Sequence, residues 1–168
     1  SYVMESEFGI RMPKPLLQDF SLKVQQLADS KQKELEPRDL YELFEREYLV
    51  DVGPIVLERY YPRPDEKDPN HIFAEAHLRI NGVSMVLKGQ GNGPISAFAQ
   101  ALRPGLDFEF AIDEFEELSL NKGADARALA YVSVKGGGAV GHGVGLATNI
   151  DQAGVRATVV AINALSRA

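Results

Sequence analysis

Apolar residues recur with two different periods along this chain, and the period changes near residue 50. Over the first part they return every third or fourth position, which is typical of helices with one buried stripe. One stripe consists of Leu17, Phe20, Val24 and Leu27, and a second, which follows Pro37, consists of Leu40, Leu43, Phe44 and Tyr48. We therefore predict two helices in this part, which pack on each other or on a partner.

From Pro54 onward apolar and polar residues alternate, as they do in strands with one buried face. The segment "HIFAEAHLRI" alternates cleanly, and Asn81-Gly82 joins it to "VSMVLKG" with a residue pair that strongly favours a hairpin. Another apolar run, "IVLERYY", precedes a charged loop, and the glycine-rich "GQGNGP" leads into a short helical pattern. Residues 55–102 therefore predict three strands followed by a helix.

The second half of the chain repeats this order without obvious residue identity. Alternation over 106–118 puts Phe108, Phe110 and Ile112 on one face, and it returns over 126–136. The glycine-rich segment 136–148 then supplies a turn and a third strand. A closing helix follows, with Asn149 as its predicted cap. Its predicted buried positions are Ile150, Ala153, Ala157, Val160 and Ala164. We predict an α+β fold, in which a helical subdomain (1–50) precedes two βββα units (51–168) that form a two-layer, pseudo-symmetric domain.

Composition narrows the function classes. The chain has 168 residues and a formal net charge of −6, which argues against general nucleic-acid binding. The apolar runs are too short to span a bilayer, and the acidic opening lacks the basic start of a signal peptide. There is no cysteine, which fits a reducing compartment. We expect a cytoplasmic protein that binds neither nucleic acid nor membrane.

Candidate catalytic groups are few and badly spaced. His71 and His77 share a strand face but lie too far apart to chelate one metal, and His142 has no partner spaced for a catalytic triad. The acidic run 113–117 lacks the spacing of a calcium loop. We predict no catalytic residue and no metal site. The glycines of 89–93 form either a tight turn or an anion-binding helix start, and the chain is best interpreted as a binding or regulatory module.

Three segments resemble a known family when they are taken together. "GNGPISAF", "EELSLNKGADARALAYVSV" and "GHGVGLATNIDQAGVRATVVAINAL" are similar, in this order, to the C-terminal leucine-sensing domain of 2-isopropylmalate synthase. The opening, through "LEPRDLYELFEREYL", resembles the linker subdomain that precedes that domain. Alternatives are the isoleucine-sensing domain of the sister enzyme citramalate synthase, an oligomerisation module with a degenerate effector site, and a small independent α+β enzyme.

The resemblance implies a regulatory fragment of an acyltransferase. In this family a metal-dependent TIM barrel condenses acetyl-CoA with 2-oxoisovalerate, and that barrel is absent from the sequence given. The fragment is then expected to be non-catalytic and free of cofactors, with a divalent metal only in the barrel. Its implied partners are L-leucine, a second copy of the chain in a homodimer, and the catalytic barrel.

The resemblance also implies an effector site between the starts of the two unit helices, near the dimer interface. Matched by motif, the implied effector-binding residues are Asn92, Gly93, Pro94, Ile95, Ser96, Ile112, Phe115, Ser119, Ala126 and Ile150. The family places a tyrosine that matches Tyr2 near the neighbouring subunit's active site. Two motifs depart from the common family pattern, namely Glu117-Leu118 and His142-Gly143-Val144-Gly145.

Overall fold

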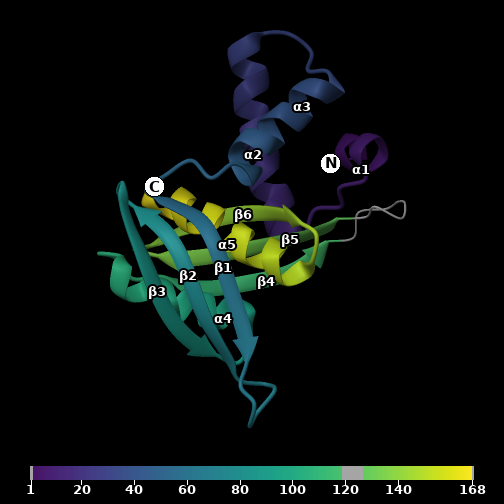
Figure 1. Ribbon diagram of the computed structural model, residues 1–168. Coiled ribbons are helices and arrows are strands. Elements are labelled where there is room, and N and C mark those ends of the chain that lie inside the picture. Colours follow the sequence, from purple (N-terminus) through teal and green to yellow (C-terminus); the bar gives the residue numbers. More distant parts are fainter. Residues whose placement is uncertain (1, 119–126, 168) are drawn as a thin grey trace.

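The computed structural model describes residues 2–118 and 127–167 (Figure 1). The N-terminal part is helical: α1 spans Tyr2–Phe8, α2 spans Lys14–Lys31, α3 spans Pro37–Phe44, and a π-helical turn, η1, continues α3 over Glu45–Leu49. Pro37 occupies the first position of α3, where its missing N–H costs nothing. The predicted boundary at residue 50 comes directly after η1, and its role as a domain boundary stays a prediction.

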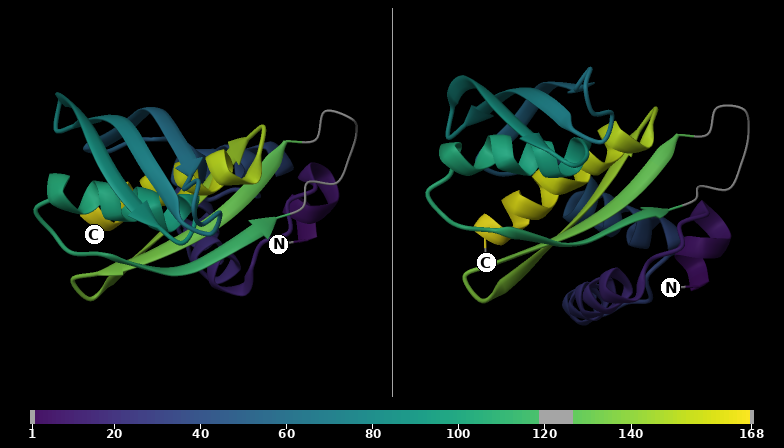
Figure 2. Two further views of the ribbon diagram at one scale, coloured as in Figure 1. Left: turned by 60° about the horizontal axis from the view of Figure 1, so that its bottom comes forward. Right: turned by 90° about the horizontal axis from the view of Figure 1, so that it is seen from below.

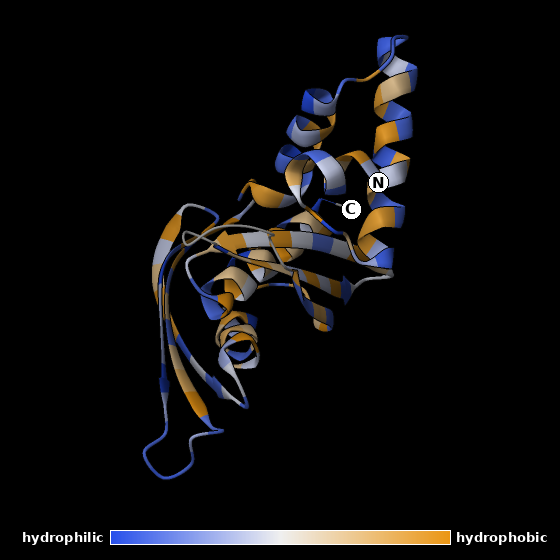
Figure 3. Ribbon diagram, turned by 90° about the vertical axis from the view of Figure 1, so that its right-hand side faces the viewer, coloured by the Kyte–Doolittle hydropathy of each residue, from blue (hydrophilic) through white to orange (hydrophobic). Residues whose placement is uncertain are grey.

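The first βββα unit follows. Strands β1 (Ile55–Pro64), β2 (Ile72–Ile80) and β3 (Val83–Gly91) form an antiparallel sheet in that order, and α4 (Pro94–Leu102) packs on it before a short 3₁₀ turn, η2 (Arg103–Gly105). Asn81 and Gly82 both have positive φ, 51° and 81°, as a two-residue hairpin turn requires. Figure 3 shows alternating hydropathy along this sheet and a hydrophilic loop between β1 and β2.

The second unit repeats the first. Strands β4 (Ala111–Leu118), β5 (Ala128–Gly136) and β6 (Ala139–Ala147) form another antiparallel sheet, and α5 (Ile150–Ser166) packs on β6 and β5. Asn149 caps α5, because its side chain accepts a hydrogen bond from the Gln152 N–H at 2.9 Å. The predicted α+β fold with two βββα units is confirmed.

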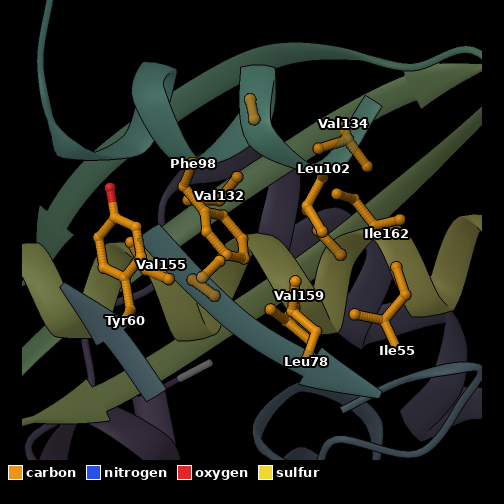
Figure 4. Packing of buried hydrophobic residues seen from close by; sticks show 14 of the residues in the cluster. Ile55, Tyr60, Leu78, Phe98, Leu102, Val132, Val134, Val155, Val159 and Ile162 are labelled. Carbon is orange, nitrogen blue, oxygen red and sulfur yellow. The ribbon is translucent and has the colours of Figure 1, made fainter. Parts of the chain in front are cut away.

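The two units face each other through their helices. One buried cluster contains side chains from both sheets and both helices, among them Tyr60, Phe98, Val132 and Val155 (Figure 4). Figure 2 shows α4 and α5 lying between the two sheets. Of the predicted buried positions, Ala153, Ala157 and Val160 are buried, whereas Ile150 and Ala164 are only partly buried. Because it has a sheet on either side, α5 is also buried around most of its circumference outside this stripe.

The N-terminal helices cover the outer face of the second sheet. The Phe20 ring packs edge to face on Phe44 and Tyr48, with centroids 5.7 and 6.1 Å apart, and the Phe44 and Tyr48 rings are tilted at 5.3 Å. All three belong to one buried cluster with Leu129 and Tyr131 of β5. The helices therefore pack both on each other and on the sheet. As a result β5 is buried on both faces, although its alternating pattern predicts only one.

The strand predicted over 106–118 is shorter than expected and begins at Ala111. The Arg103 guanidinium donates to the Phe110 carbonyl at 2.8 Å and stacks on the Phe110 ring at 4.4 Å. A side chain thus satisfies a backbone group that a neighbouring strand would otherwise satisfy. Phe110 is nevertheless buried, so its predicted inward position is confirmed.

Candidate functional site

The glycines of 89–93 have two different roles. Gly89 and Gly91 lie in β3 directly under α4, and a Cβ at either position would stand 2.5 Å from an α4 atom, Ala101 N or Ser96 Oγ. These two glycines therefore allow the helix to approach the strand closely. Gly93 differs, because it is the N-cap of α4, has extended backbone and has no other atom within 4 Å of a Cβ position.

The start of α4 leaves backbone donors available. Gly93 has no side chain to cap the helix, Pro94 has no N–H, and the Ser96 hydroxyl turns back to Gly93, from whose N–H it accepts a hydrogen bond at 3.1 Å. Within the described residues, the N–H groups of Ile95 and Ser96 make no hydrogen bond. Free donors at the positive end of a helix dipole favour an anionic group.

Three elements meet beside this helix start. A Cβ on Gly154 of α5 would stand 2.5 Å from Ile95 Cδ1 of α4 and 3.3 Å from Phe115 Cε1 of β4. Ile112 and Ile150 are partly buried against the same core. Phe115 is 47% exposed, so this apolar surface is open in the single chain.

Tyr60 of β1 packs against α4 and its start. Its hydroxyl donates to the Pro94 carbonyl, and its ring packs edge to face on Phe98 with centroids 5.2 Å apart (Figure 4). Burial raises the pKa of Tyr60, and the nearby Asp151 carboxylate raises this pKa further. Asp151 lies in the first turn of α5, so this turn places a carboxylate near the Tyr60 side chain.

The structure thus brings together some of the residues that the sequence predicts for the effector site. Gly93, Pro94, Ile95 and Ser96 form the start of α4, and Ile95 meets Phe115. Asn92 is exposed just before this helix. The expected positions Ser119 and Ala126 lie outside the described residues, and Tyr2 is 83% exposed on α1.

Sequence reasoning missed Tyr60, Asp151 and Gly154. A signal was available for Tyr60, since it lies on the inward face of an alternating strand and a buried tyrosine hydroxyl needs a hydrogen-bond partner. Asp151 comes close to Tyr60, and Gly154 to α4, only through the tertiary fold.

Metal-ligating groups do not gather in the described residues, where no cluster of three or more His, Cys, Asp or Glu side chains could hold an ion. His71 is hydrogen-bonded to Gln90 at 2.7 Å and His77 to Glu75 at 2.8 Å.

A separate cavity of about 970 Å³, lined in part by Pro54, Phe108 and Leu165, lies at the opposite end of α5 from the predicted effector site. None of the described helices is long and apolar enough to cross a bilayer.

Comparison with known proteins identifies the chain's relatives. The family model of the LeuA allosteric (dimerisation) domain matches residues 34–166. The chain is 35% identical to a 2-isopropylmalate synthase from Mycobacterium ulcerans, over 99% of this chain and 30% of the relative. It is 36% identical to a 2-isopropylmalate synthase from Thermobifida fusca, over 97% of this chain and 28% of the relative. It is also 36% identical to a 2-isopropylmalate synthase from Ralstonia nicotianae, over 99% of this chain and 29% of the relative. The chain therefore spans about 30% of the length of the curated relatives it matches.

Proposed function

Because the chain belongs to the family of LeuA allosteric (dimerisation) domains, we propose that it is the regulatory part of a 2-isopropylmalate synthase and senses L-leucine. In this proposal leucine binds between the starts of α4 and α5 and causes feedback inhibition of the catalytic barrel. The chain itself associates as a homodimer, carries no catalytic residue and holds no cofactor. The observation that carries the proposal is the uncapped start of α4 next to an open apolar surface.

The start of α4 supplies the site for the leucine carboxylate. Its free N–H groups at Ile95 and Ser96 suit an anion, whereas the start of α5 already has one N–H satisfied by Asn149. Asp151 supplies the opposite charge for the leucine ammonium group, since it lies close enough to act on Tyr60, whose hydroxyl donates to the start of α4. A zwitterionic ligand thus has a partner for each of its charges.

The leucine side chain packs on the apolar surface formed by Ile95, Ile112, Phe115 and Ile150. The contact of Ile95 and Phe115 at Gly154 supports this, because Gly154 leaves room where any side chain would fill the gap. A pocket walled by branched and aromatic residues selects an aliphatic ligand.

A second copy of the chain completes the pocket. Phe115 is 47% exposed beside partly buried apolar residues, and an exposed apolar surface of this kind is typical of an interaction site.

The test is L-leucine affinity, measured by calorimetry, in variants at both charge partners. Gly93→Asp places a negative side chain where the carboxylate binds, and Asp151→Asn removes the partner of the ammonium group. Each change should weaken leucine binding by about tenfold or more, because Gly93→Asp introduces repulsion between like charges and Asp151→Asn weakens a charge-assisted hydrogen bond. Gly93→Ala is the matched control, because its Cβ has no atom within 4 Å and adds no charge. Native leucine affinity in Gly93→Asp would refute the anion site.

A further inference from the structure

Another pocket lies between the N-terminal half of α2 and the second sheet, and its lining includes no residue from the starts of α4 and α5. Figure 1 shows that α2 reaches the second sheet with one end only. The volume of this pocket is about 300 Å³, which is enough for a small organic molecule. Polar lining comes from four elements: Gln18 and Asp19 of α2, Asp113 and Glu114 of β4, Ser133 of β5 and His142 of β6. Glu114, Ser133 and His142 are direct cross-strand neighbours.

Ser133 is the unusual member of this pocket. Its side chain is 1% exposed, and its hydroxyl has no hydrogen-bond partner within the described residues. Burial raises the pKa of Tyr131 to about 12, and the nearby Ser133 hydroxyl opposes this rise. The Tyr131 and Ser133 hydroxyls nevertheless do not have the geometry of a hydrogen bond. A buried hydroxyl without a partner is costly, and one that lines a pocket is available to a ligand.

The charges in the pocket are negative. Asp19 pairs with Lys23 at 3.0 Å, and Asp113 pairs with Lys135 at 3.3 Å. Glu114 has no ion-pair partner among the described residues, so one negative charge is left uncompensated.

The other groups beside the pocket do not compensate this charge. His142 accepts or donates a 2.8 Å hydrogen bond to the Tyr131 hydroxyl through Nδ1, and burial lowers the pKa of His142, which keeps the ring neutral. The Tyr48 hydroxyl donates to Asp19 at 2.6 Å, and Glu47 shares Lys23. The site therefore suits a single positive charge.

Apart from the uncharged amide of Gln18, the remaining walls are apolar. Leu22 of α2 is 67% exposed and Val140 of β6 is 47% exposed, and both line the pocket together with Pro15. Exposed aliphatic side chains beside a carboxylate suit a ligand that has a short hydrocarbon chain as well as a charge. A bare metal ion fits less well, because no described cluster of ligating side chains could hold one.

We propose that this pocket binds a primary alkylammonium ion. The ammonium group donates to the Glu114 carboxylate and to the Ser133 hydroxyl, and the alkyl chain lies against Leu22 and Val140. Because the ligand contacts both α2 and the sheet, its binding stabilises the attachment of the N-terminal helices to the second unit. This site is independent of the proposed leucine site.

The probe is n-butylammonium chloride, added to the whole chain and followed by nitrogen–proton correlation NMR. Saturable shifts should appear in α2, β5 and β6, and not with 1-butanol or with potassium chloride at equal ionic strength. Shifts of the same size with either comparator, or no saturable shifts with the probe, would overturn the proposal.

Two variants and one control locate the site. Glu114→Gln should weaken binding by about tenfold or more, and Ser133→Ala should weaken it by a smaller factor. Ser133→Ala removes an unpartnered hydroxyl and so should not unfold the chain. The matched control is Glu117→Gln, which removes the same charge from the same strand outside the pocket. An equal loss of butylammonium binding in the control would show general charge attraction and refute the site. Leucine affinity should be unchanged in all three variants, and its measurement tests the proposed function separately.

Discussion

Asn163 holds the first unit to the second through two buried hydrogen bonds, and its replacement by alanine tests this junction. The side chain is fully buried in α5. Its Nδ2 donates to the Ile55 carbonyl at 2.9 Å, and its Oδ1 accepts from the Ile55 N–H at 3.0 Å. Both backbone groups of a fully buried residue at the start of β1 thus depend on one side chain from a helix 108 residues away.

The expected loss follows from these two bonds. Asn163→Ala leaves a buried N–H and a buried C=O without partners, and each such group costs about 1–3 kcal/mol. The free energy of unfolding should therefore fall by roughly 2–5 kcal/mol. For a chain of this size, about 2–4 °C of melting temperature corresponds to each kcal/mol, so the melting temperature should fall by roughly 4–20 °C.

Urea unfolding followed by circular dichroism measures this loss. The midpoint should fall while the slope stays constant, since the variant exposes the same surface on unfolding. Asn92→Ala is the matched control: it removes an exposed amide and should change stability by less than about 0.5 kcal/mol. If Asn163→Ala lost less than about 1 kcal/mol, the reasoning about the junction would be wrong.

Two further predictions concern the second unit. A Cβ on Gly143 of β6 would overlap the Ala157 carbonyl of α5, so Gly143→Ala should cost at least about 1–3 kcal/mol in urea unfolding, against little change for Gly93→Ala. Burial lowers the pKa of His142 below its ordinary value of 6.5, despite the opposing charge of Asp19. His142 therefore binds a proton less readily in the folded state than in the unfolded state. The contribution of His142 to the free energy of unfolding is present above pH 6.5 and is lost as the pH falls from 6.5 through the lowered pKa. His142→Gln should remove this part of the pH dependence of the urea midpoint, and an unchanged profile would contradict the assignment.

Local patterns were sufficient for most of the secondary structure. Alternation in β2 places Ala74, Ala76, Leu78 and Ile80 inward, and all four are buried. The Asn81-Gly82 turn and the Asn149 cap also act within a few residues of their position. Such features depend on neighbours in sequence, and the sequence therefore predicts them directly.

Long-range packing explains what the patterns could not predict. The burial of α5 on nearly all sides depends on a first sheet formed about a hundred residues earlier, and the buried outer face of β5 depends on α2 and η1. The start of β4 depends on the Arg103 side chain. No local period carries this information.

The candidate site also combines features that local sequence predicts with features that only long-range packing creates. The sequence suggests one glycine-rich feature over 89–93, whereas in the structure Gly89 and Gly91 allow close packing and only Gly93 belongs to the helix start. The proximity of Asp151 to Tyr60, and of Asp19 to Ser133 and His142, arises from residues distant in sequence. The sequence alone therefore could not predict that these residues act together.

The most direct test of the leucine-sensor account is calorimetric titration of the native chain with L-leucine, L-isoleucine and L-valine. Leucine should bind saturably and more tightly than valine by about tenfold or more, because one methylene in an apolar pocket contributes about 1–3 kcal/mol. Tighter binding of valine or isoleucine than of leucine, or no saturable heat with leucine, would contradict the account.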